Sequence, residues 1–137
     1  MPRFDRNAYV SPEGVTLDTN VDFGDVGGLA YLDPDVELDQ LSYFHTLIDL
    51  LVKELKYVTG TDLHGAPYDW RMAPDGLGSY FEKLRKLIEK TWSANRNQEV
   101  ILISHSMGGP ILQSFLNSMS VEWKKKHIKV RRDLILT

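Results

Sequence analysis

The sequence contains no cysteine in its 137 residues. That absence excludes disulfide bonds, a thiolate nucleophile and cysteine-based metal sites, and it is consistent with a reducing compartment. No segment approaches the roughly 18 consecutive apolar residues that a membrane-spanning helix needs. Histidines and carboxylates do not occur at the spacing of metal ligands, so we expect neither a metal ion nor another cofactor.

A strong excess of charge is also missing. The chain has 16 Lys and Arg residues against 19 Asp and Glu residues, and the net charge of −3 argues against nucleic acid as a partner. The polar start from Met1 to Arg6 is not followed by an apolar stretch, which is unlike a secretory signal. With 42% hydrophobic residues, the composition is that of an ordinary globular protein, and we expect residues 1–137 to form one domain.

Hydrophobic spacing predicts alternating helices and strands. Residues 1–30 are rich in Gly, Asp and Asn and predict a loop with one or two short strands, around residues 15–17 and 21–23. The remaining expected elements are a helix from about Asp39 to Leu55 that stops near Gly60, a brief strand over 62–67, a helix over 79–94, a strand over 99–104 and a helix after residue 106. This order is typical of an α/β layer with parallel strands.

The most informative stretch is residues 101–110, where an apolar β-branched run ends in Ser-His-Ser-Met-Gly and an apolar helical pattern follows. This arrangement is typical of a nucleophile elbow, in which a serine lies on a strained turn between a strand and a helix. Ser106 is the candidate nucleophile, and the backbone N–H of Met107 is the candidate oxyanion donor. Ser104 and Gly108 are small, as the close approach of strand and helix requires. The alternative is an ordinary helix-capping serine.

A serine nucleophile also needs a carboxylate and a histidine, which follow the serine in that order in this kind of site. After Ser106 the acids are Glu122 and Asp133, and the histidine is His127. Asp133 follows the histidine, and Glu122 lies too close to it for two residues that normally follow separate strands. His105 adjoins the serine, but we expect its side chain to leave the turn in another direction. We therefore expect this chain to lack its own complete triad, and also the Gly-rich loop that supplies a second oxyanion donor.

Several longer motifs support a family resemblance over about residues 14–128. They are Tyr31-Leu32-Asp33-Pro34, Ser42-Tyr43-Phe44-His45-Thr46, Gly65-Ala66-Pro67-Tyr68-Asp69-Trp70-Arg71, Ala73-Pro74 with Tyr80-Phe81, His105-Ser106-Met107-Gly108 and Trp123-Lys124. Together they resemble the lecithin:cholesterol acyltransferase family. The run that begins at Gly65 is long and unusual, which makes the resemblance specific.

The resemblance implies a partial α/β-hydrolase fold whose N- and C-terminal parts are missing. It implies an enzyme that moves a fatty acyl group from a phospholipid, through an acyl-serine, to water or to a lipid alcohol such as a sterol, ceramide or diacylglycerol. It assigns Ser106 as nucleophile and Met107 as backbone oxyanion donor. It also implies a membrane or lipoprotein surface as a partner, and a lysosomal, secreted or membrane-associated location. After Ile128 the sequence departs from the family pattern, as expected of a truncated or misjoined product or a fragment.

Other features have ordinary explanations beside functional ones. Residues 68–71 either shape an acyl or headgroup pocket or form a packed loop with an Asp–Arg pair, and we favour the loop. His45 and His64 are interpreted as packed or surface histidines. The basic run 124–132 is interpreted as a solvated helix end rather than a lipid contact or nuclear address. Two alternatives to a lipid acyltransferase stay open: a catalytically silent fragment, and a small-ester hydrolase on the same fold.

Overall fold

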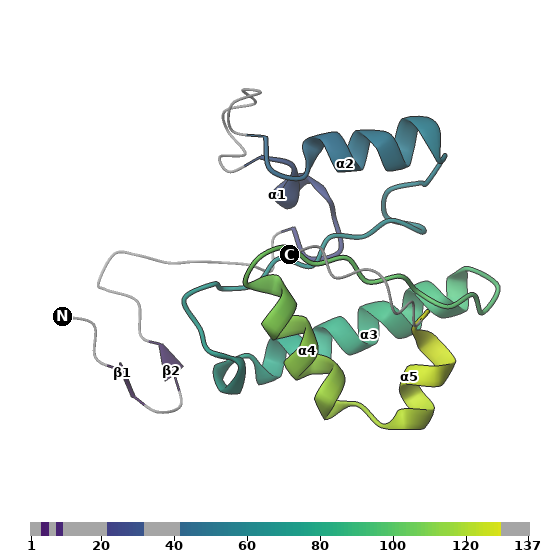
Figure 1. The fold of residues 1–137 in the computed structure, drawn as a ribbon. Helices are drawn as coiled ribbons and strands as arrows, with labels where there is room; N and C mark the ends of the chain where they lie inside the picture. Colours follow the sequence, from purple (N-terminus) through teal and green to yellow (C-terminus); the bar gives the residue numbers. More distant parts are fainter. Residues whose placement is uncertain (1–3, 6–7, 10–21, 32–41, 130–137) are drawn as a thin grey trace. The chain divides into compact units, whose positions relative to one another are not determined.

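The computed structural model describes residues 4–5, 8–9, 22–31 and 42–129 (Figure 1). These residues divide into two compact units. One unit contains the described residues of 1–14 and 70–137, and the other contains those of 15–69. The expectation of a single domain stays a prediction.

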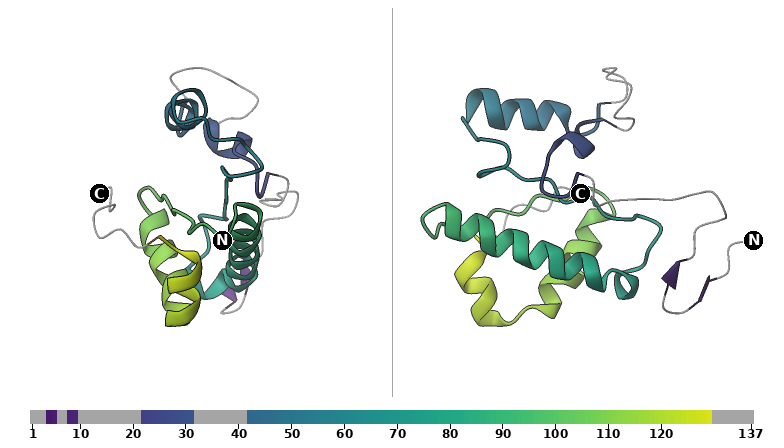
Figure 2. Two further views of the ribbon diagram at one scale, coloured as in Figure 1. Left: turned by 90° about the vertical axis from the view of Figure 1, so that its right-hand side faces the viewer. Right: turned by 180° about the vertical axis from the view of Figure 1, so that it is seen from behind.

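Three helices build most of the first unit: α3 (Gly78–Ala94), α4 (Gly108–Ser118) and α5 (Val121–His127). A short 3-10 turn, η3 (Pro74–Gly76), precedes α3. The helices predicted over 79–94 and after residue 106 are therefore confirmed. Figure 2 shows α4 and α5 on the same side of α3. Ser120 caps α5, because its hydroxyl accepts a hydrogen bond from the Trp123 N–H at 3.1 Å.

The core of this unit centres on Phe115 of α4, which is fully buried. Its ring lies 5.8 Å from that of Phe81 on α3 and 5.9 Å from that of Trp123 on α5, measured between centroids. These are favourable separations for tilted and edge-on aromatic pairs. The other buried apolar residues are Leu77, Leu84, Ile88, Ile111 and Ile128. Burial of this set is what fixes α4, and with it the turn that precedes α4.

The strand expected over 99–104 is reduced to one parallel bridge. The Val100 N–H donates to the His127 carbonyl at 2.7 Å, and the Lys129 N–H donates to the Val100 carbonyl at 3.0 Å. Beyond that bridge Ile101 and Ile103 are exposed. A parallel strand needs neighbouring backbone along its whole length, and the described residues offer it only this one pair. The α/β layer is thus not confirmed by the described part of the chain.

The brief strand expected over 62–67 does not form: residue 62 lies in a turn, residue 63 forms an isolated bridge, and residues 64–67 have no regular secondary structure. The N–H groups of Thr61, Asp62 and Leu63 all donate to the Val58 carbonyl, and only a single bridge joins Thr59 to Leu63. Of the strand expected around residues 21–23, residues 22 and 23 lie in a turn, whereas residue 21 and residues 15–17 lie outside the described residues. An antiparallel pair forms instead between β1 (Phe4–Asp5) and β2 (Ala8–Tyr9).

The second unit contains α1 (Gly27–Ala30), α2 (His45–Asp49) and a π-helical continuation, η2 (Leu50–Glu54). The helix expected from Asp39 is confirmed from residue 45 onward, and Asp39 itself lies outside the described residues. The expected stop at Gly60 is a turn residue with φ of +74°, a conformation that favours glycine. Within the described ranges, no helix is both long and apolar enough to cross a membrane.

Candidate active site

Ser106 lies on a tight turn directly before α4. Its φ is +53°, in the left-handed region, which costs a residue with a side chain roughly 1 kcal/mol. The Gly108 N–H donates to the His105 carbonyl, and the Gly109 N–H donates to the Ser106 carbonyl, both at 3.0 Å. These two bonds close the turn on both sides of the serine. The backbone therefore has the strained conformation expected at a nucleophile elbow.

The turn presents its side chains to solvent. Ser106 is exposed, and Met107 is 43% exposed. A Cβ atom added at Gly108 would lie 3.5 Å from the Cβ of Ser104, which is ordinary van der Waals contact. Small residues at both positions therefore fit. The positive end of the α4 dipole lies at this turn, where it favours developing negative charge.

The turn conformation itself is testable by substitution. We expect Ser106→Gly to be more stable than Ser106→Ala by about 1 kcal/mol, because glycine adopts positive φ without a steric penalty. Urea unfolding of the two variants measures the difference. Equal stabilities would contradict the left-handed conformation at residue 106.

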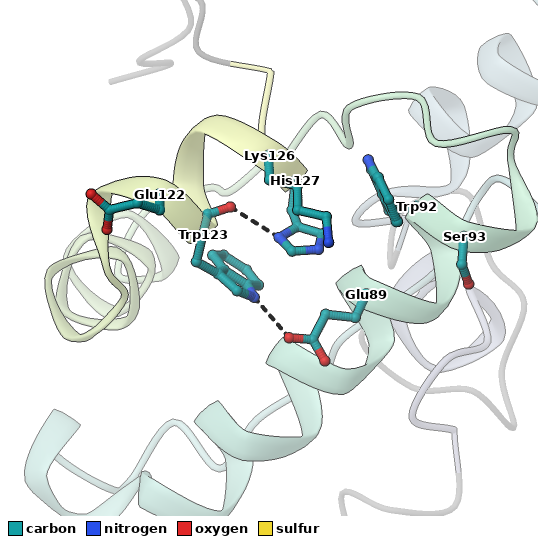
Figure 3. A pocket seen from close by; sticks show the side chains of 7 residues that line it. All are labelled: Glu89, Trp92, Ser93, Glu122, Trp123, Lys126 and His127. Carbon is teal, nitrogen blue, oxygen red and sulfur yellow. Dashed lines mark hydrogen bonds between the residues drawn. The ribbon is translucent and has the colours of Figure 1, made fainter.

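The histidine and acid that follow Ser106 lie elsewhere. His127 is buried, with ring centroids of Trp92 and Trp123 at 5.1 and 4.8 Å, and its Nδ1 donates to the Trp123 carbonyl at 2.9 Å. It lines a pocket of about 460 Å³ together with Glu89, Trp92, Ser93, Glu122, Trp123 and Lys126 (Figure 3). Among the described residues, the lining of this pocket includes Glu122 and His127 but not Ser106. Asp133 lies outside the described residues.

The pocket is held together by Glu89, which the sequence analysis did not single out. Its carboxylate accepts hydrogen bonds from the Trp123 indole and from Arg85, both at 2.8 Å. Burial raises the pKa of Glu89, but the Trp123 hydrogen bond and the Arg85 charge outweigh it and leave that pKa below its usual value. The charged form therefore stabilises the α3–α5 contact above the usual carboxyl pKa, and this contribution is lost as the pH falls. The sequence signal was the i, i+4 spacing of Arg85 and Glu89.

The loop 68–71 and His45 were also considered as candidates. Burial, with a smaller contribution from Tyr43, raises the pKa of Tyr68. Trp70 is 69% exposed, so the loop 68–71 is not packed at its tryptophan. His45 stacks on Tyr31 with ring centroids 4.9 Å apart, and its Nε2 lies 3.6 Å from Asp49.

Two lysines of the basic run have local partners. Lys124 donates to the Leu116 carbonyl at 3.0 Å, and the ammonium of Lys126 lies 4.6 Å from the Trp92 ring centroid. Residues 124–127 form the last turn of α5, as expected of a helix end, and residues 130–132 lie outside the described residues. In the portion of the chain that the structure describes, no three His, Asp or Glu side chains form a group that would hold a metal ion.

The family model for lecithin:cholesterol acyltransferase matches residues 4–131. The chain belongs to the lecithin:cholesterol acyltransferase family. It is 42% identical over 119 residues to the lysosomal phospholipase A and acyltransferase of Bos taurus. The aligned region covers 86% of this chain and 28% of that protein. The chain is 40% identical over 114 residues to lecithin-cholesterol acyltransferase-like 1 of Arabidopsis thaliana, covering 78% and 26% respectively.

A further member of the family, the phosphatidylcholine-sterol acyltransferase of Gallus gallus, is 37% identical over 106 residues, covering 77% of this chain and 24% of that protein. The chain thus spans about a quarter of the length of the curated lecithin:cholesterol acyltransferase relatives it matches. Membership in this family implies an α/β-hydrolase fold. In the described residues, parallel pairing is limited to two isolated bridges, Thr59 with Leu63 and Val100 with Ile128.

Proposed function

We propose that Ser106 is the nucleophile of a lipid acyltransferase or phospholipase. The observation that carries this proposal is the positive φ of an exposed serine at the start of α4, in a chain whose relatives are named as phospholipases and acyltransferases. A capping serine has no need of this conformation, because cap residues ordinarily have extended backbone. A strained, solvent-facing serine is what acyl transfer requires.

In the proposed reaction the Ser106 oxygen attacks the carbonyl carbon of a phospholipid ester while a histidine takes the hydroxyl proton. The Met107 N–H stabilises the negative charge that develops on the carbonyl oxygen. The ester C–O bond then breaks, the lysophospholipid leaves with the proton from the histidine, and an acyl-serine remains. Water or a lipid alcohol attacks the acyl-serine in the same manner and regenerates the hydroxyl.

The proposed base and acid do not come from Glu122 and His127. The His127 ring is buried between two indoles and donates from Nδ1 to a backbone carbonyl, so that nitrogen is not available to a carboxylate. In a serine triad the acid accepts a hydrogen bond from one ring nitrogen while the other faces the serine. We therefore propose that residues 22–129 supply the nucleophile and a backbone oxyanion donor, and that other residues of the active enzyme supply the triad partners.

The proposed acyl donor is a phospholipid at a membrane or lipoprotein surface, and the proposed acceptor is water or a lipid alcohol. This choice rests on the relatives, which are named for phospholipase A and phosphatidylcholine-sterol acyltransferase activities. A small-ester hydrolase is the competing enzyme, because the turn at Ser106 serves any acyl ester equally well.

The isolated chain is proposed to be catalytically silent. The exposed Ile101 and Ile103 beside the single Val100–Ile128 bridge favour this second candidate. An apolar segment whose backbone is largely unpaired among the described residues invites pairing with another polypeptide. On this proposal the 137-residue chain hydrolyses no ester and associates in solution.

A chimera separates these proposals. Residues 22–129 replace the matching region of the lysosomal phospholipase A and acyltransferase of Bos taurus, so that the host supplies the other catalytic groups. We expect the chimera to release fatty acid from phospholipid vesicles and to transfer acyl groups to an added lipid alcohol, and the isolated chain to do neither. A folded chimera that cleaves only a water-soluble ester would support the small-ester hydrolase. Ester turnover by the isolated chain would overturn the silent candidate.

A further inference from the structure

His64 bridges two segments of the second unit through both of its ring nitrogens. Its Nδ1 lies 3.0 Å from the Gly24 carbonyl oxygen, and its Nε2 lies 3.2 Å from the Thr61 carbonyl oxygen. The first carbonyl belongs to the turn before α1, and the second belongs to the turn around residues 58–63. The side chain is half-buried between them.

The backbone around this ring is tightly fitted. The Gly24 N–H donates to the Gly65 carbonyl at 2.8 Å, next to the histidine. A Cβ atom at Gly65 would clash with the Asp25 carbonyl oxygen. The two segments are therefore in direct backbone contact, and the His64 imidazole bridges the same two segments.

A neutral imidazole cannot satisfy both carbonyls. It carries one N–H donor and one lone-pair acceptor, whereas a carbonyl oxygen is an acceptor only. In either tautomer one ring nitrogen therefore directs its lone pair at a carbonyl oxygen. The protonated ring has two N–H groups and donates to both carbonyls at once.

We propose that His64 is a pH-dependent clamp: its protonated ring joins the Gly24 and Thr61 carbonyls, and loss of the proton releases one of them. The clamp holds residues 22–27 against residues 58–65 in acid. The clamp is complete while the ring carries both protons and weakens when the ring loses one of them. The clamp acts on the fold of the second unit, independently of catalysis by Ser106.

The two bridged segments carry three acidic side chains. Asp22 and Asp25 lie on the first segment, and Asp62 lies on the second. The Asp25 carboxylate accepts from the Gly27 N–H at 2.8 Å, and the Asp62 carboxylate accepts from the Val58 N–H at 2.5 Å. The ammonium of Lys56 donates to the Lys53 carbonyl at 2.6 Å.

Amide hydrogen exchange of the 137-residue chain tests the clamp. The reporters are the N–H groups of Gly24 and Gly60, which donate to the Gly65 and Leu63 carbonyls. We expect their protection, relative to an unstructured peptide at the same pH, to fall by about tenfold between pH 5.5 and pH 7.5, because a charge-assisted hydrogen bond is lost. The Asn95 N–H at the end of α3 is the control reporter and should show no such change.

Variants distinguish the effect of the ring's positive charge from the effect of the rest of the His64 side chain. His64→Arg keeps a permanent positive charge with several donors, so we expect high protection at both pH values. His64→Phe keeps a ring but no donor, so we expect low protection at both. His45→Gln, which removes the other described histidine of this unit, should keep the wild-type response. The ¹⁵N shifts of the His64 ring in the wild-type chain give the protonation state even where a variant does not fold. A neutral ring at pH 5.5, or a pH response that persists in His64→Phe, would overturn the clamp.

Discussion

Ser106→Ala is expected to lower phospholipid hydrolysis and acyl transfer by the chimera by about a thousandfold or more. The alanine keeps the turn but removes the oxygen that forms the acyl-serine. The remaining oxyanion donor can then assist only the direct attack of water on the ester, which is far slower. Initial rates on phospholipid vesicles, with and without a lipid alcohol, measure the loss in both branches of the reaction.

The matched control for this variant is Ser93→Ala. Ser93 is also an exposed serine, on α3, and its hydroxyl donates to the Lys90 carbonyl at 2.9 Å. We expect this variant to retain the activity of the chimera. If Ser106→Ala were as active as Ser93→Ala, Ser106 would not be the nucleophile and the proposed mechanism would be wrong.

Phe115→Ala is expected to destabilise the chain by about 3–5 kcal/mol. The side chain is fully buried, and its ring packs against Phe81 and Trp123, so truncation leaves a cavity between α3, α4 and α5. Neighbouring rings are large and rigid and fill such a space poorly. Urea unfolding followed by tryptophan fluorescence measures the change, because Trp123 lies beside the cavity.

Val121→Ala serves as the comparison for Phe115→Ala. Val121 is 55% exposed in the first turn of α5, and its truncation should change the free energy of unfolding by no more than about 0.5 kcal/mol. A similarly small effect of Phe115→Ala would show that α4 is not anchored by this side chain. The turn at Ser106 would then lack the support that the account assigns to it.

Helices were the part of the fold that sequence reasoning predicted well. The stripe of Phe81, Leu84 and Ile88 has the helical period, and α3 begins at Gly78, one residue before the expected start. Such a signal is local, because residues three and four apart on one helix share a face. The same argument located α4, whose Ile111 and Phe115 are buried as the pattern predicts.

Strands and side-chain junctions were predicted poorly, because they depend on partners distant in sequence. The apolar run 99–104 has the composition of a buried strand, yet in the described residues it pairs only through Val100. The π-helical turn at Leu50–Glu54 has no signature in the hydrophobic spacing. In the sequence, nothing distinguishes His64 from an ordinary histidine, because its partners, the Gly24 and Thr61 carbonyls, are known only from the structure.

The candidate site was predicted in part: its turn depends on local sequence, whereas the partners of its serine do not. The small-x-Ser-x-Gly pattern singled out Ser106 because the turn chemistry is local, and the structure adds the positive φ that the pattern implies. The partners of the serine are non-local. Order and spacing made Glu122 and His127 poor candidates, and the structure places them in the α3–α5 pocket, whose described lining does not include Ser106.

The central claim is that Ser106 accepts the acyl group. A fluorophosphonate probe reacts with a serine that an adjacent base has activated, and peptide mass spectrometry locates the adduct. We predict that in the chimera the adduct lies on the peptide that contains Ser106, and that the Ser106→Ala chimera is unlabelled in this region. Equal labelling of both forms, or an adduct on another serine of residues 22–129, would contradict the account.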